Sequence, residues 1–370
     1  MQGVIGQPSR LPRAMNILFA IERRVDAGSI YALEKYVRAG KKFGHRFAIY
    51  GNPDPRFPDF IFSTDLHVFD FVVFIFESRL KWMSGLQLAY LLTNVLRSRR
   101  VIFDADGMYN QTVVLDDYDR NHTTEGERER WLASYAALAD RIFQPSLQPQ
   151  ERSVQPLLLY GYDAPVCYRR ADSKRVDIMH LGHNWWRWRE VSERLLPAIE
   201  RVRGQLDEIW FIGLWWDVPP DWAAHIGQGD AFRVDPQRFR QLGIRTRPPV
   251  PYHDVIQTMS TARINIMTQR PVFRRLGLLT SKYFEIFEAD TIPLVMLEPE
   301  HAARVYGPAG RELALHDGIA DKLIDVLAQP ERYQAHVDAV RQHLAVHHSY
   351  ERRVQELVEA LHCDMPLLRG

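Results

Sequence analysis

Met15-Asn-Ile-Leu-Phe-Ala-Ile21 and Val176-Asp-Ile-Met-His-Leu181 are short, mostly apolar runs, and each leads into a glycine-containing turn and a helical pattern. Runs of this kind form strands that are buried on both faces of a parallel sheet. The first run is followed by a loop with Gly28, by a helical stretch and by a second strand at residues 46–51. Strand, loop, helix and strand make a βαβ unit with a right-handed crossover.

The alternation of strands and helices continues along both halves of the chain. The further strands that we expect lie at 69–76, 101–103, 139–146, 208–212, 262–267 and 292–296. The further helices lie at 85–97, 125–138, 188–204, 281–288, 319–328, 330–346 and 350–361. This pattern predicts an α/β fold of two facing Rossmann-like domains, with an interdomain cleft at the carboxyl ends of their strands.

The domain boundaries follow from the breaks in this pattern. Residues 1–14 read as a flexible leader, residues 15–160 as the N-terminal domain and residues 161–345 as the C-terminal domain. Residues 346–370 form a helical tail that we expect to return to the N-terminal domain. Residues 148–172 are rich in proline, have no clean periodicity and read as a linker.

The composition of the chain indicates which partners and which cellular compartment to expect. The 370 residues include 47 Lys and Arg against 46 Asp and Glu, a net charge of +1. This balance argues against nucleic acid as a partner. Cys167 and Cys363 are too few for a disulfide framework. No secretory signal or transmembrane segment is present, so we expect a cytoplasmic protein.

Several catalytic signatures are absent, and one carboxylate pair stands out. The chain has no G-x-G-x-x-G, P-loop, G-x-S-x-G or H-E-x-x-H motif. Asp104 and Asp106 follow an expected strand and resemble a metal-binding D-x-D, although such pairs are common in turns. We favour Asp106 as a cleft-facing catalytic residue and expect no metal site, since His347-His348 has no third ligand either.

Residues 270–290 place a basic, glycine-containing loop directly before a helix. Thr280 or Ser281 can cap that helix, and its first turn carries Lys282. The helix start would favour a phosphate. Glu285, one turn later, is placed to accept hydrogen bonds from ribose hydroxyls. An ordinary amphipathic helix is the alternative.

Lys282-Tyr-Phe-Glu285, followed by the strand Ile292-Pro-Leu-Val, resembles a motif of group 1 glycosyltransferases of the GT-B fold. The branch named after the spore maturation protein CgeB is the most similar. Residues 26–29, the Gly-His before the second strand and the tail at 347–353 are also similar to this superfamily. Lys282 replaces the usual Arg, and Asp290 stands where the family often has Gly.

The resemblance implies a glycosyltransferase that moves a sugar from a nucleotide-diphosphate donor, a UDP- or GDP-sugar, to an unidentified acceptor. It implies a metal-independent, retaining reaction with no cofactor besides the donor. The donor would lie on the C-terminal domain and the acceptor near the loop of Gly28 and Ser29. The resemblance places Gly182, Lys282, Glu285 and Arg187 or Arg189 on the donor. The helix start adds Thr280 and Ser281 to the donor-binding candidates.

Nine tryptophans are present, and several cluster beside the expected donor loops. Trp185, Trp186 and Trp215 are candidates for stacking on a sugar or a base. Trp216 is expected to face the same cleft. Simple packing is the alternative for all of them. For the whole protein, a non-catalytic GT-B-like glycan- or partner-binding role and a nucleotide-sugar epimerase remain open.

Overall fold

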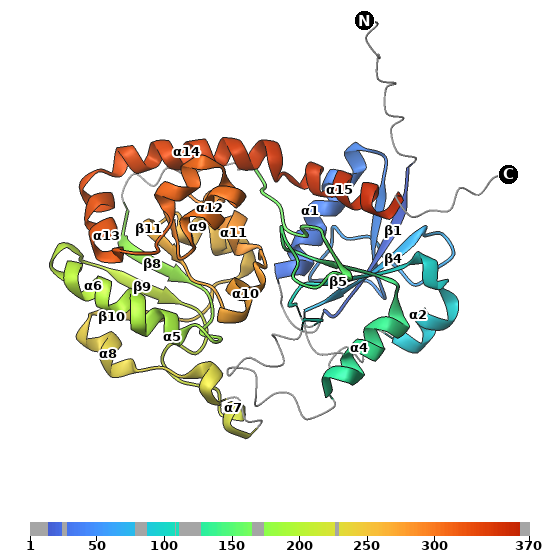
Figure 1. Cartoon of the computed structure of the whole chain (residues 1–370), viewed down its shortest axis with the longest axis horizontal. Helices are drawn as coiled ribbons and strands as arrows, with labels where there is room; N and C mark the ends of the chain where they lie inside the picture. The colour runs from blue at the N-terminus through green and yellow to red at the C-terminus, as the bar shows by residue number, and fades with distance from the viewer. Residues whose placement is uncertain are drawn as a thin grey trace, which may run out of the picture.

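The computed structural model describes residues 14–23, 28–77, 87–107, 109–110, 127–164, 174–225 and 229–362. The expected leader lies almost entirely outside these residues, as do Cys167, Cys363 and part of the expected linker. Two separate parallel sheets, each covered by helices, lie side by side (Figure 1). The predicted α/β fold with parallel sheets in two domains is confirmed.

The N-terminal sheet has the strand order β3-β2-β1-β4-β5-β6-β7, and all its pairs are parallel. Its strands are β1 (Asn16–Ile21), β2 (Arg46–Tyr50), β3 (Phe62–Ser63), β4 (Phe71–Phe76), β5 (Arg100–Asp104), β6 (Arg141–Gln144) and β7 (Val154–Pro156). Its helices are α1 (Gly28–Lys42), α2 (Leu88–Asn94), η3 (Arg97–Arg99) and α4 (Glu127–Leu138).

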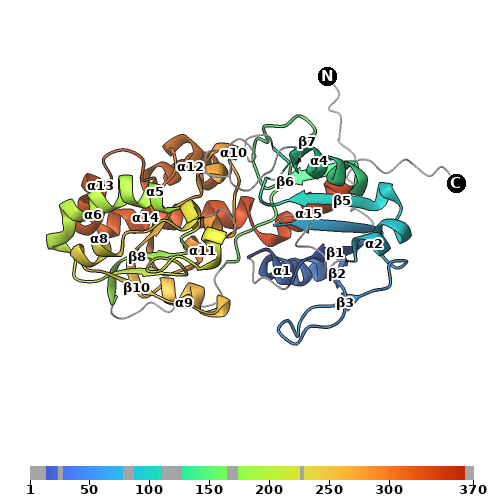
Figure 2. The same ribbon diagram turned by 90° about the horizontal axis from the view of Figure 1, so that it is seen from below.

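Alternation along the strands explains why helices cover both faces of this sheet. Ile17 and Phe19 belong to one buried cluster together with residues of α1, whereas Leu18 and Ala20 belong to a second cluster with residues of α2 and α4. Successive side chains of a strand point to opposite faces, so a wholly apolar strand needs a cover on each side. Figure 2 shows the sheet between these helix layers.

The C-terminal sheet has the order β10-β9-β8-β11-β12 and is also entirely parallel. Its strands are β8 (Val176–Leu181), β9 (Ile209–Ile212), β10 (Ile244–Arg247), β11 (Ala262–Met267) and β12 (Ile292–Val295). The helices between them are α5 (Trp188–Glu190), the π-helix η5 (Val191–Leu195), α6 (Leu196–Val202), η6 (Arg203–Gln205), α7 (Trp222–His225), η7 (Gly229–Phe232), α8 (Pro236–Gln241), η8 (Tyr252–Asp254), α9 (Val255–Met259), α10 (Pro271–Leu276) and α11 (Lys282–Glu288). The closing helices are α12 (Pro299–Tyr306), η9 (Pro308–Leu313), α13 (Ile319–Ala328), α14 (Pro330–His347) and α15 (Tyr350–His362).

Three features differ from the sequence expectations. Residues 154–156 of the expected linker form β7, which pairs with β6. The edge strand β10 was not anticipated, because its sequence Ile-Arg-Thr-Arg buries only Ile244 and gives no apolar run. The expected helix at 188–204 is present but contains the π-helical segment η5.

The last two helices join the domains. Helix α14 lies along the C-terminal domain, and α15 packs on α1 of the N-terminal domain (Figure 1). Between them, the carbonyl of His348 accepts a hydrogen bond of 2.7 Å from the backbone N–H of Tyr162. The two segments in which the chain passes between the domains are therefore hydrogen-bonded to each other. Within the described residues, no helix is both long enough and apolar enough to cross a membrane.

We predict that Leu357→Ala lowers the free energy of unfolding by about 3 kcal/mol, since a buried leucine that is truncated leaves a cavity. Leu357 is 2% exposed within the core that α15 shares with α1. Urea unfolding would measure the change, with the exposed Gln355→Ala on the same helix as a control. An unchanged midpoint in Leu357→Ala would show that α15 adds nothing to the fold.

Candidate functional site

The candidate site lies where the loops after β8 and β11 separate. Strand order reverses at this point, because the chain runs outward from β8 to β9 and β10 and then returns to β11 on the other side. Ligands bind at such switch points in open α/β sheets. The loop after β8 stays close to the neighbouring loop: a Cβ on Gly213 would lie 2.3 Å from the carbonyl oxygen of Gly182. Gly213 also has a φ of 148°, which residues with a side chain rarely adopt. Both this backbone conformation and the close approach to Gly182 therefore require glycine at position 213.

Three basic side chains act on this switch point. Arg187 is half-buried and donates from Nη1 to the carbonyl of His183 at 2.8 Å. Burial and the nearby charge of Arg270 lower the pKa of Arg187 to about 10. Lys282 and Arg187 both help to lower the pKa of His180, where burial is the main cause. Like charges held together in this way favour an anion between them.

Arg270 is the member of this group that the sequence reasoning did not single out. Its guanidinium lies 4.5 Å from the ring centre of Phe273 and 5.6 Å from that of Trp185. Its Nε is buried and has no hydrogen-bond partner. Within the described part of the chain, neither Arg187 nor Arg270 has a carboxylate within ion-pair distance. The signal available in the sequence was its position, three residues after a buried strand.

Glu285 lies in helix α11 and is 4% exposed. Its Oε2 is 2.8 Å from Nζ of Lys282, and its Oε1 accepts a hydrogen bond of 3.2 Å from the Tyr252 hydroxyl. Burial alone would raise the pKa of Glu285, but Lys282, Lys35 and Ser281 together hold it below its usual value. Glu285 is thus an ionised carboxylate with polar partners on both oxygens, which suits a hydrogen-bond acceptor.

The start of α11 differs in detail from the prediction. Ser281 is the residue before the helix, but its side chain makes no capping hydrogen bond. Thr280 contributes its carbonyl, which accepts from the backbone N–H of Tyr283 at 3.1 Å. A Cβ on Gly28, at the start of α1, would lie 2.8 Å from Oγ of Ser281. Gly28 and the buried Ser29 therefore lie at the contact between the two domains.

A stacked pair of tyrosines reinforces this contact. Tyr31 of α1 and Tyr252 of the C-terminal domain have ring centres 3.6 Å apart and an interplanar angle of 4°. Beside them, Nζ of Lys35 is 3.6 Å from Oε2 of Glu288. Burial raises the pKa of Glu288 to about 7, although Lys35 opposes the shift. The domains thus meet beside Glu285 through both apolar and charged contacts.

Asp104 and Asp106 have different surroundings. Asp104 is fully buried and accepts hydrogen bonds from the Tyr135 hydroxyl, the Tyr109 backbone N–H and the Gln144 amide at 2.8–3.0 Å. Its carboxylate therefore holds the loop after β5. Asp106 is half-buried in that loop, next to Gly107, where a Cβ would lie 2.5 Å from the side chain of Leu276. Asp106 thus lies where the N-terminal domain approaches α10.

Glu77 is a second carboxylate in this region that the sequence reasoning missed. It follows β4 directly, at the carboxyl end of the strand beside β1, which is the switch point of the N-terminal sheet. The Tyr160 hydroxyl donates to Oε1 of Glu77 at 3.0 Å. Burial raises the pKa of Glu77, although its hydrogen bonds oppose the shift. Burial is the main cause of the raised pKa of Tyr160, and the charges of Glu77 and Asp106 add to it, so both carboxylates lie near Tyr160.

The tryptophans divide into two groups. Trp185 and Trp215 pack at a centroid distance of 6.0 Å beside Phe232, in a small aromatic cluster that includes Trp186. Trp186 and Trp215 have left-handed backbones, with φ of 57° and 66°. Trp216 was expected to face the cleft, but it is fully buried and its indole N–H donates to the Gly182 carbonyl at 2.7 Å. It is a core residue that supports the Gly182 loop.

Arg189 lies apart from the other predicted donor residues. Its side chain is 64% exposed and pairs with Glu193 at 3.1 Å, one turn along the same helical segment. Within the described residues, no group of three or more His, Cys, Asp or Glu side chains is arranged to hold a metal ion.

Part of the C-terminal half of the chain is similar in sequence to a known protein family. A family model described as glycosyl transferase-like matches residues 190–359. These residues, which make up less than half of the chain, are similar to that family. No finer branch is distinguished, so the likeness to CgeB stays a prediction. No curated protein matches the chain in sequence.

Solved structures extend the similarity to the fold of the whole chain. An alpha-glucosyltransferase in complex with UDP-glucose and DNA superposes with a TM-score of 0.60 at 11% identity, covering 94% of this chain and 99% of that one. The T4 phage BGT in complex with UDP-glucose gives 0.56 at 11% identity, covering 95% and 99%. At this identity the likeness shows the fold, which is that of GT-B glycosyltransferases.

These structures correct one expectation. The near-zero net charge led us to exclude nucleic acid as a partner, yet several structures with this fold are bound to DNA. Net charge sums over the whole chain, whereas a nucleic acid contacts one face, so a neutral total does not exclude it.

His180 offers a test of the site's electrostatics. Its pKa is lowered to about 3, mainly by burial, so the folded protein keeps it neutral while the unfolded chain binds a proton below pH 6.5. Stability from this residue is fully present above pH 6.5 and is lost as the pH falls toward 3. We predict that His180→Asn reduces the loss of unfolding free energy between pH 7 and pH 5 by about 2 kcal/mol.

Urea unfolding at both pH values measures this difference. The exposed His225→Asn on α7 is the matched control and should keep the wild-type pH dependence. An equal pH dependence in wild type and His180→Asn would mean that His180 is not held neutral by the fold.

Proposed function

We propose that this protein is a glycosyltransferase that uses a nucleotide-diphosphate sugar, a UDP- or GDP-sugar, as its donor. The observation that carries the proposal is the convergence of Arg187, Arg270 and Lys282 at the switch point between β8 and β11, next to the ionised carboxylate of Glu285. Structures with the same fold are complexes with UDP-glucose or UDP, which supports UDP as the nucleotide.

The three cations would neutralise the diphosphate as it leaves. Negative charge develops on the leaving group in the transition state, and donors that are already in place stabilise it most. Arg270 brings a buried N–H without a partner, which a phosphate oxygen would satisfy. Gly182 leaves room for the donor to approach the backbone. Arg189 keeps a donor role only as a prediction, since it pairs with Glu193 in this structure.

Glu285 would hold the ribose. Its oxygens now accept from Tyr252 and lie against Lys282, and the ribose hydroxyls would join or replace these partners. The proposed reaction needs no metal ion, because the arginines and Lys282 supply the positive charge. One structure of the same fold contains UDP and Mn²⁺, so EDTA treatment is an essential test of this point.

On the acceptor side, Asp106 and Glu77 are the candidate catalytic carboxylates. A general base must reach the acceptor hydroxyl, and both groups lie at the carboxyl ends of the N-terminal strands that face the donor loops. Retention of the donor's anomeric configuration is part of the proposal and rests on the family resemblance. The anomeric coupling constant in a proton NMR spectrum of the product would decide it.

Two other functions remain to be tested against this one. A non-catalytic GT-B-like protein would bind a glycan or a partner without turnover, and a nucleotide-sugar epimerase would change the donor without an acceptor. Nucleic acid belongs among the acceptors to be tried, because structures of this fold are bound to DNA.

We predict that UDP or GDP raises the melting temperature of the protein and that Arg270→Met weakens this binding by roughly 10- to 100-fold, the usual worth of a charge-assisted hydrogen bond. Glu285→Gln should weaken it too, without a loss of fold. Calorimetric titration measures the nucleotide Kd of both variants. The control is Arg240→Met, because Arg240 is an exposed arginine on α8. If no nucleoside diphosphate binds the wild type, the donor site is wrong.

We predict that Asp106→Asn or Glu77→Gln lowers kcat by about 10²- to 10⁴-fold, the range for loss of a general base, while the nucleotide Kd stays at the wild-type value. Nucleotide release from the donor, with and without acceptor, is the measurement. Whichever variant keeps full activity is thereby removed as the base, and activity in both would move catalysis elsewhere.

A further inference from the structure

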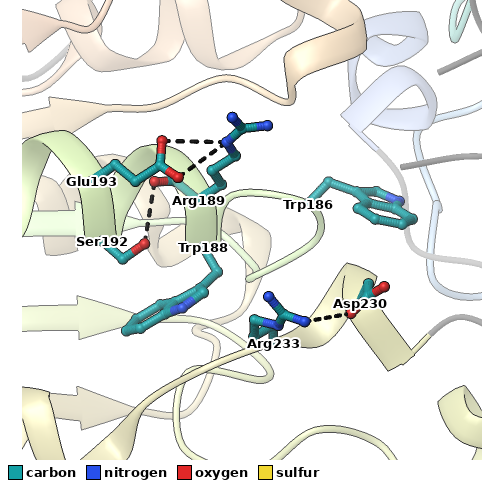
Figure 3. Close-up of a pocket in the computed structure, with 7 residues that line it drawn as sticks. All are labelled: Trp186, Trp188, Arg189, Ser192, Glu193, Asp230 and Arg233. Carbon is teal, nitrogen blue, oxygen red and sulfur yellow. Dashed lines mark hydrogen bonds and ion pairs between the residues drawn. The ribbon is translucent and has the colours of Figure 1, made fainter. Parts of the chain in front are cut away.

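A cavity of about 400 Å³ lies beside the proposed donor site, on the other side of β8. Trp186 and Trp188 form two of its walls, and Ser192 of the π-helix η5 contributes a hydroxyl. Figure 3 shows the tryptophans on different sides of the cavity, the Arg189–Glu193 pair along one edge and the Arg233–Asp230 pair along another. The volume falls within the range of ligand pockets.

The charges of the lining cancel. Arg189 is 3.1 Å from Glu193, and Arg233 is 3.0 Å from Asp230. This differs from the donor site, where Arg187 and Arg270 have no carboxylate partner among the described residues. A cavity with paired charges does not favour a polyanion, but its planar groups offer both donors and acceptors of hydrogen bonds. Together with aromatic walls, this suits a neutral ligand rich in hydroxyl groups.

The walls are fixed by a network around Asn184. The fully buried side-chain amide of Asn184 donates to the carbonyls of Trp215 and Arg233, each at 2.9 Å. The backbone N–H of Trp186 donates to the carbonyl of Ala231 at 2.8 Å. Three separate segments of the chain are therefore held in one arrangement around the cavity.

This network keeps two residues in strained conformations. The backbones of Trp186 and Trp215 are left-handed, and such strain in a residue other than glycine persists only where the surroundings enforce it. The π-helix that carries Ser192 and Glu193 is a second rare element at the same cavity, and π-helical turns occur often at functional sites. The π-helix also contributes Val191 and Leu195 to the buried core, whereas Ser192 and Glu193 line the cavity.

The position indicates which substrate the cavity takes. The proposed donor occupies the β11 side of β8, where Arg270, Lys282 and Glu285 lie. The cavity lies on the β9 side, since Asp230 and Arg233 follow β9 in the chain. Trp186 adjoins Arg187, so a ligand here would lie next to the donor diphosphate. Arg189, which pairs with Glu193, is the one predicted donor residue that also lines the cavity. The second substrate of the reaction is therefore the better occupant.

We infer that this cavity binds a neutral carbohydrate, as the acceptor of the transfer reaction. The role of this carbohydrate as the acceptor rests on the proposed function, but its binding to the cavity can be tested by itself. It places acceptor recognition on the C-terminal domain, in addition to the loop of Gly28 and Ser29.

The test is the binding of neutral trisaccharides (maltotriose, cellotriose and chitotriose) and of a short DNA duplex to the full chain, by saturation-transfer NMR and calorimetry. We expect one trisaccharide to bind and Asp230→Ala or Arg233→Ala to weaken it at least tenfold. The matched control is Arg201→Ala, because the Arg201–Asp321 pair has the same 3.0 Å separation and a similar exposure on another face of the domain.

Binding of nucleoside diphosphates in the same variants separates this inference from the proposed function. Loss of saccharide binding with an unchanged nucleotide Kd supports the cavity. Saccharide binding that Asp230→Ala and Arg233→Ala leave unchanged overturns it, as does binding of DNA alone or of no trisaccharide. Saccharide binding through the cavity without any nucleotide binding would keep the carbohydrate site and reject the transferase.

Discussion

The parallel pairing of β8 with β11 is the constraint on which the site depends. Because β9 and β10 lie on one side and β11 and β12 on the other, the loops that leave β8 and β11 part at the carboxyl edge. That divergence brings Arg187 and Arg270, which are far apart in sequence, into one electrostatic environment. It also divides the edge into a positively charged side and a side where charges are paired.

The contact between the domains depends on the same edge. The first turn of α1 approaches Ser281 at the start of α11, and Tyr31 stacks on Tyr252, whose hydroxyl reaches Glu285. A carboxylate that is proposed to hold the donor is thus one side chain away from the N-terminal domain. Relative movement of the domains would change the surroundings of Glu285 before it changed those of Arg187.

The sequence predicts the elements whose burial is complete and misses those whose burial is partial. Strands such as β1 and β4 are apolar or nearly apolar runs, so their positions follow from the sequence alone. The edge strand β10 and the short β7 have one buried residue each and give no such signal. The motif around Lys282 and Glu285 could be found because its residues are close in sequence.

Other parts of the site depend on contacts between distant residues. Trp215 and Trp216 are neighbours, yet Trp215 packs on the small cluster of Trp186 and Phe232 while Trp216 lies in the main core, because the left-handed backbone at Trp215 turns the chain between them. Asp104 and Asp106 separate for a similar reason, since only Asp104 meets Tyr135 and Gln144. Spacing along the chain does not contain this information.

The hydrogen bond between Tyr162 and His348 has a mechanical consequence. The two domains are connected by a pair of laterally bonded tethers, and a pair resists twisting more than a single tether does. Opening and closing by bending across the pair is the motion that such a connection leaves easiest. A protease that cut the chain near Tyr162 would leave the C-terminal domain attached to the N-terminal domain only by non-covalent packing, which includes that of α15 on α1.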